Sequence, residues 1–159
     1  MKKLLRLTFQ WGLKLNAALT RHPLGRPFEQ RWLTPGFVAL TRRIRGAPPA
    51  PVAPTPEALG REWERLLGNR LYARITAIDE ASATAYGEIS GYCPLRGSGD
   101  VAACHRLMAY DRGLLATHGG RFVVLASQAE RGRQTCQIAI RSQLLPAEDL
   151  IAAHQRKAG

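Results

Sequence analysis

Acidic residues are scarce in this chain of 159 residues, where 12 Asp and Glu stand against 23 Lys and Arg and the formal net charge is +11. The shortage is local. Residues 1–46 contain ten Lys and Arg but one acid, Glu29, whereas the rest of the chain contains 13 basic and 11 acidic residues. The basic character therefore belongs to an N-terminal segment, and the remainder is close to neutral.

Cysteine is also scarce, with three residues at wide and irregular spacing, Cys93, Cys104 and Cys136. A small secreted protein held by disulfides has an even set of cysteines, so the odd number argues against that class and favours a reducing compartment. The sequence has neither a Cys-x-x-Cys zinc knuckle nor the Gly-Lys-Ser/Thr end of a phosphate-binding P-loop. Phosphate chemistry of the P-loop kind is therefore not expected.

No uninterrupted apolar run reaches the roughly 20 residues that a transmembrane helix needs. Arg6 and Lys14 interrupt the most apolar N-terminal stretch, and the same charges break the apolar region that a signal peptide requires. Residues 1–21 instead predict an amphipathic helix, with Trp11 and Leu15 on the apolar side and basic residues on the other. Neither a membrane-spanning nor a cleaved targeting segment is expected.

A basic amphipathic helix with Trp and Leu on its apolar side is typical of proteins that lie on an anionic membrane surface. The alternatives are docking of residues 1–46 on a larger protein complex or on the protein's own domain. Nucleic acid is the least favoured partner, because phosphate contacts would use the charges but not the apolar side that carries Trp11. These features predict a cytoplasmic location, peripheral to the inner membrane.

Five prolines within residues 47–56 predict an extended linker. It divides the chain into a basic helical segment, residues 1–46, and a cysteine-containing domain, residues 57–159. In the latter, patterns of period two and period 3.6 alternate. They predict helices over 57–67 and about 101–115, strands over 70–79, 84–92, 121–127 and 136–141, and a closing helix over 146–157. We therefore expect an α+β fold with an antiparallel four-stranded sheet and helices packed on one face.

The stretch from residue 91 to 141 contains all three cysteines together with His105, Asp111 and His118. Alternation along the last strand places Cys136 on the core side with two isoleucines. Helical spacing places Cys104 and Asp111 on a buried stripe. A buried carboxylate is costly without a partner, which makes Asp111 the most unusual residue of the stretch.

Three interpretations of these residues stay open. Cys93, Cys104 and Cys136, joined by His105, have the ligand types of a tetrahedral zinc site, and iron is the other metal considered. Alternatively, Cys93 is a nucleophile or ligand contact, with His105 and Asp111 as its acid–base partners. In the third interpretation, Cys104 and Cys136 are small core hydrophobes.

Several short motifs resemble the C-terminal part of the L-2-amino-thiazoline-4-carboxylic acid hydrolase family, which is similar to the vinyl-4-reductase small-molecule-binding domains. The motifs are Cys93-Pro94, Cys104, Asp111-Arg112, Gly119-Gly120, the strand over 122–128, and the turn from Glu130 to Cys136. The resemblance covers roughly residues 57–145. It implies an α+β domain with a cysteine-lined pocket.

The resemblance also implies ring-opening hydrolysis of a C–N bond, in which a thiolate or metal-bound water attacks carbon and an acid protonates the leaving nitrogen. Two functional classes follow. One is a membrane-surface-associated accessory or sensor protein that binds a small molecule or metal. The other is a C–N bond hydrolase.

Overall fold

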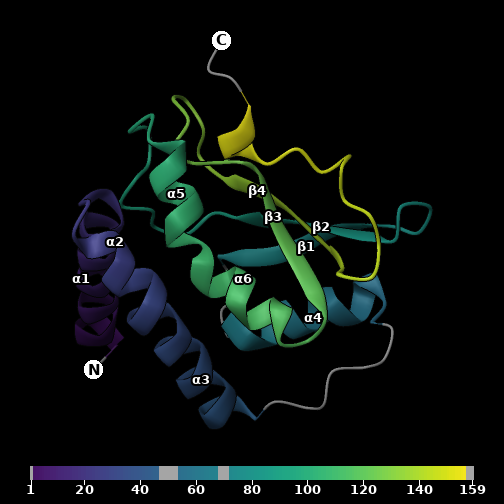
Figure 1. The fold of residues 1–159 in the computed structure, drawn as a ribbon, viewed down its shortest axis with the longest axis horizontal. Coiled ribbons are helices and arrows are strands. Elements are labelled where there is room, and N and C mark those ends of the chain that lie inside the picture. Colours follow the sequence, from purple (N-terminus) through teal and green to yellow (C-terminus); the bar gives the residue numbers. More distant parts are fainter. Residues whose placement is uncertain (1, 47–53, 68–71, 157–159) are drawn as a thin grey trace.

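The structure is a computed structural model that describes residues 2–46, 54–67 and 72–156. Helices at the N-terminal end lie beside a sheet that is covered by further helices and by the C-terminal segment (Figure 1). The helical elements are α1 (Lys2–Arg21), α2 (Gly25–Phe28), the π turn η1 (Glu29–Leu33), α3 (Thr34–Arg45), α4 (Pro56–Leu67), α5 (Val101–Leu107), α6 (Ala109–Ala116) and the 3-10 turn η2 (Ala153–Gln155). The strands are β1 (Ala73–Asp79), β2 (Thr84–Ile89), β3 (Gly120–Ala126) and β4 (Cys136–Ser142).

The four strands form one antiparallel sheet in the order β1-β2-β4-β3, which confirms the predicted α+β class. β1 and β3 are therefore the edges. β4 pairs with β2 and β3, so Cys136 lies opposite Ile89 in the centre of the sheet. The predicted linker falls partly on residues 47–53, outside the described residues.

The main core lies between α4 and one face of the sheet. Helix α4 begins where predicted, and the Thr55 side chain accepts a hydrogen bond from Ala58 N (3.3 Å), as an N-cap residue does. Leu59 and Trp63 point from α4 toward the sheet and are fully buried. The core residues that share this cluster are Ala73, Ala85, Leu115, Phe122, Val124, Cys136, Ile138 and Ile140.

The opposite face is covered in part by the C-terminal segment, residues 143–156. The Arg141 side chain points to the face of β4 opposite the core, yet it is buried. Its guanidinium donates to the Pro146 carbonyl (2.7 Å) and to both carboxylate oxygens of Asp149 (2.6 and 2.7 Å). The predicted closing helix over 146–157 is wrong, because Pro146 and Asp149 bond to Arg141. Only η2 is helical in the described part of this segment.

Two other predictions differ in detail. A β-bulge between Ile75 and Ala77 interrupts the period of two predicted for this strand, so Ile78 packs against the core and Ala77 is exposed. The helix predicted over about 101–115 is two helices, α5 and α6, that meet at Met108, whose backbone leaves helical geometry (ψ 10°).

The N-terminal helices pack on the rest of the chain through one side. Val38 of α3 joins Leu66 and Leu114 in a second cluster, and the Thr41 and Tyr110 hydroxyls lie 2.7 Å apart. Helix α1 contacts α5, where the Arg106 side chain donates to the Thr20 carbonyl (2.7 Å). Docking on the protein's own domain, one of the three alternatives from the sequence, is therefore present.

The chain from Gly25 to Arg45 is helical without a break, because the π turn η1 joins α2 directly to α3. Pro27 lies in the first turn of this helix, where no N–H is needed. The Thr34 hydroxyl, inside this helix, donates to the buried Glu29 carboxylate (2.5 Å). The continuous helix thus has an inward side that is fixed by specific contacts.

Candidate functional site

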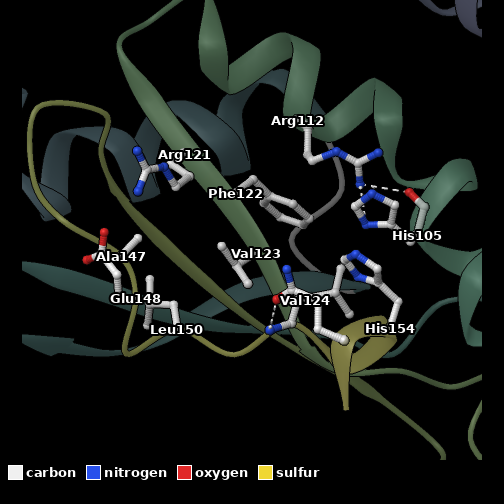
Figure 2. Close-up of a pocket in the computed structure, with 12 residues that line it drawn as sticks. His105, Arg112, Arg121, Phe122, Val123, Val124, Ala147, Glu148, Leu150 and His154 are labelled. Carbon is white, nitrogen blue, oxygen red and sulfur yellow. Dashed lines mark hydrogen bonds between the residues drawn. The ribbon is translucent and has the colours of Figure 1, made fainter. Parts of the chain in front are cut away.

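A cavity of about 330 Å³ lies between the edge strand β3, helices α5 and α6, and the C-terminal segment. Figure 2 shows its lining side chains. They are His105, Arg112, Arg121, Phe122, Val123, Val124, Ala147, Glu148, Leu150, Ala152, His154 and Gln155. The volume is in the range of small-molecule sites. We call this cavity the β3 pocket.

One end of the β3 pocket is basic. Arg112 of α6 donates from Nη1 to the His105 carbonyl (2.7 Å) and lies 3.4 Å from His105 Nδ1. The imidazoles of His105 and His154 stack, with ring centroids 3.7 Å apart and planes 29° apart. Figure 2 shows the three side chains gathered at one end, from α5, α6 and η2.

Arg112 carries the positive charge of this end, because burial and charge repulsion disfavour protonation of the two histidines. Burial, Arg112 and His154 lower the pKa of His105 to about 4, so its imidazole is neutral at physiological pH. Burial and Arg112 likewise lower the pKa of His154. Among the described residues, no salt bridge joins Arg112 to a carboxylate.

The other end of the pocket contains Arg121 together with Glu148 and Leu150, and Phe122 and Val123 lie between the two ends (Figure 2). Opposite charges on Arg121 and Glu148 offset one another there. The pocket therefore has an uncompensated basic end, an apolar middle and an end of mixed charge.

The pocket wall formed by residues 147–152 depends on Arg141. Replacing Arg141 with Met removes its bonds to the Pro146 carbonyl and to Asp149. We expect the loss of these hydrogen bonds to lower the free energy of unfolding by about 1–3 kcal/mol. The loss is not larger because the Asp149 carboxylate can return to water. Faster amide exchange in residues 146–152 is also expected.

Urea unfolding and amide hydrogen exchange would measure both effects. Arg74→Met is the matched control, since its ion pair with Glu88 is exposed and should change stability by no more than about 0.5 kcal/mol. Equal losses in the two variants would contradict the role of Arg141.

The thiols lie next to this pocket and do not line it. Cys104 and Cys136 are hydrogen-bonded to one another and buried, and Cys93 packs on the cluster that contains Cys104. The hydrogen bond from Cys136, followed by that from Ser127, lowers the pKa of Cys104 to about 7, whereas the Cys104 sulfur and burial raise the pKa of Cys136. Cys104 lines only a separate hollow of about 10 Å³, so the implied cysteine-lined pocket is not the β3 pocket.

The metal prediction gains no support from this arrangement. Among the described residues, which include Cys93, Cys104 and Cys136, no three His, Cys, Asp or Glu side chains are grouped as a metal site would require. Cys104 and Cys136 instead bond to each other and to protein donors, since Cys104 bonds to Ser127 and Cys136 Sγ accepts from Gln128 N (3.3 Å), and the three thiols pack among apolar neighbours. We therefore do not assign zinc or iron to them.

The predicted catalytic residues lie in different surroundings. Asp111 is buried beneath α4 and accepts a hydrogen bond from Trp63 Nε1 (3.1 Å), His105 lines the β3 pocket, and Cys93 belongs to the thiol cluster. No hydrogen bond among the described residues joins any two of these three. His118 lies elsewhere again, 3.1 Å from Glu62 of α4.

Sequence reasoning missed the basic end of the pocket. Arg112 entered only as part of a motif, and His154 was placed in a helix that does not form. The spacing of His105 and Arg112, seven residues or two helical turns, was a usable signal for a shared side. The position of His154 depends on the path of residues 143–152, for which no local pattern is diagnostic.

A second candidate site is a surface. The large exposed apolar side chains of the N-terminal helices and of the turn between α1 and α2 are Trp11, Leu15, Leu24, Phe28, Trp32, Phe37, Leu40 and Ile44. We call these residues the N-terminal apolar surface. Exposed Lys14, Arg31, Arg42 and Arg43 lie among them in the sequence, and Lys14 Nζ is 5.6 Å from the Trp11 ring.

None of the described helices combines the length and apolar character needed to cross a bilayer. No family model, curated protein or solved structure matches the chain. The resemblance to the hydrolase family therefore stays a prediction.

Proposed function

We propose that this protein is a small-molecule-binding protein that docks on an anionic membrane surface through α1–α3. The observation that carries the proposal is the N-terminal apolar surface, because isolated proteins rarely expose so many large apolar side chains in one segment. For the hydrolase alternative, no hydrogen bond within the described part of the chain joins the predicted nucleophile Cys93 to His105 or Asp111.

The spacing of the apolar residues supports docking on a plane. On α3, Phe37, Leu40 and Ile44 follow at three and four residues, so they lie on one side, opposite the inward Val38 and Thr41. Phe28 and Trp32 lie four residues apart on the same continuous helix, and Leu24 lies four residues before Phe28, in the turn that precedes it. The helix therefore has an outward apolar side along most of its length.

The charges favour an anionic lipid surface over a neutral apolar partner. Arg42 and Arg43 flank the outward side of α3 and are exposed, and Lys14 and Arg31 are exposed on α1 and η1. Each basic residue near an anionic bilayer is worth about 1 kcal/mol. Side chains such as Trp11 and Trp32 have the apolar body and polar edge that suit the interface.

Binding of a small molecule is supported by the β3 pocket. Its volume of about 330 Å³ fits a ligand of small-metabolite size, and its walls combine apolar side chains with a few charged ones. The docking helices contact the helices that line the pocket, because α3 packs on α6 and α1 packs on α5.

Co-sedimentation of the full chain with vesicles tests the docking proposal. We expect binding to vesicles of phosphatidylglycerol mixed with phosphatidylcholine, and little binding to phosphatidylcholine alone. The triple variant Phe37→Ser, Leu40→Ser, Ile44→Ser should reduce the lipid partition coefficient at least tenfold, because about 1 kcal/mol or more is lost for each apolar side chain.

The double variant Leu144→Ser, Ile151→Ser is the matched control, since both side chains are exposed and apolar but lie outside the N-terminal helices. It should bind like the unmodified chain. Equal binding by the triple variant, or equal binding to neutral and anionic vesicles, would contradict docking through α3 on an anionic surface.

A further inference from the structure

The charge of Arg112 is half-buried and unusually placed. Its Nη1 donates to the His105 carbonyl, and among the described residues no hydrogen bond uses its remaining nitrogens. The neighbouring carboxylates do not neutralise it through contact. Asp111 accepts from Trp63, and Glu29 accepts from Thr34.

Loss of water lowers the pKa of Arg112 against the raising effect of Asp111, Cys104 and Glu29, so these groups do not fully offset the cost of burying its charge. A guanidinium presents five N–H donors in a planar fork that matches the oxygens of a carboxylate or phosphate. At this end of the β3 pocket the donors have access to a cavity, and no acidic side chain among the described residues that line the pocket lies there.

We propose that the Arg112 end of the β3 pocket binds the terminal oxyanion, phosphate or carboxylate, of a small ligand whose apolar body lies along Phe122 and Val123. The inference rests on the small-molecule-binding part of the proposed function and adds the ligand class. Arg112 binds the oxyanion, and His105 and His154 supply ring nitrogens beside it.

The difference in charge between the two ends of the pocket determines the orientation in which an anionic ligand would bind. Arg121 shares its end with Glu148, so an anion gains less there than beside Arg112. The apolar middle excludes water from one side of the oxyanion, which strengthens its interaction with the guanidinium. A ligand with an anionic head and a ring or short chain therefore fits in one orientation.

The test is proton NMR of the four histidines during titration of the full chain, without vesicles, with phenyl phosphate and, separately, with benzoate. Signals of His105 and His154 should shift on saturation. His22, exposed after α1, and His118, paired with Glu62, are internal controls that should not shift. The two probes distinguish phosphate from carboxylate as the preferred head group.

Variants assign the contact. Arg112→Gln should weaken binding of the better probe at least tenfold, and Arg112→Lys should weaken it less, because charge is kept and the fork is lost. Arg131→Gln, at an exposed turn, is the matched control and should not change binding. His154→Phe keeps a ring against His105 but removes the ring nitrogens, and it should weaken binding severalfold. This variant tests the site independently if Arg112→Gln does not fold.

Neutral benzamide completes the experiment. Binding as tight as that of benzoate and phenyl phosphate would overturn the oxyanion assignment while leaving a ligand-binding pocket. Absence of shifts at His105 and His154 with both anionic probes would also overturn it. Neither result bears on lipid docking, which the vesicle experiment decides separately.

Discussion

Replacing Trp63 with Ala is expected to lower the free energy of unfolding by about 3–5 kcal/mol. The Trp63 side chain is 0% exposed, its ring lies 5.8 Å from that of Phe122, and its Nε1 donates to Asp111. The variant loses packing between α4 and the sheet and also leaves a buried carboxylate without its donor.

Urea unfolding followed by circular dichroism measures this loss. Trp32→Ala is the matched control, because Trp32 is 66% exposed on the continuous N-terminal helix and should change stability by no more than about 0.5 kcal/mol. If both variants lose the same amount, the core is not centred on α4 as described.

Replacing Asp111 with Asn is expected to remove a large pH dependence of stability. Burial raises the pKa of Asp111 from 3.8 to about 6, against the lowering effect of the Trp63 hydrogen bond. The folded protein thus binds this proton more tightly than the unfolded chain does. The stabilisation is complete below about pH 4 and is lost as the pH rises to about 6 and beyond.

A shift of this size corresponds to about 3 kcal/mol. Stability of Asp111→Asn relative to the unmodified protein should therefore rise by up to about 3 kcal/mol between pH 3.5 and pH 7, measured by urea unfolding. Asp79→Asn is the control of opposite sign, because Ser82 lowers the pKa of Asp79. A flat difference for Asp111→Asn would mean that this carboxyl is not held in a water-poor site.

The elements with strong local patterns were predictable from sequence. Alternation placed Cys136 in the core, and helical spacing placed Cys104 and Asp111 on a buried side, as found. The partner of Asp111 was not predictable, because Trp63 is 48 residues away and meets it only through packing of α4 on α6.

Departures from the predicted fold have long-range causes. The β-bulge in β1 changes which side chains face inward without any proline or glycine to mark it. The C-terminal segment forgoes a helix because Arg141 bonds its backbone and Asp149. Such competition between a local preference and a distant side chain cannot be read from a short window of sequence.

Under the proposed membrane docking, the continuous helix from Gly25 to Arg45 has a mechanical consequence. Its inward residues Val38 and Thr41 fix it to Leu114 and Tyr110 of α6, each two positions from Arg112 along the chain. The helix proposed to face lipid thus packs directly on a helix that lines the β3 pocket. The height and tilt at which the helix settles would then set the direction in which the cavity mouth opens relative to the membrane plane.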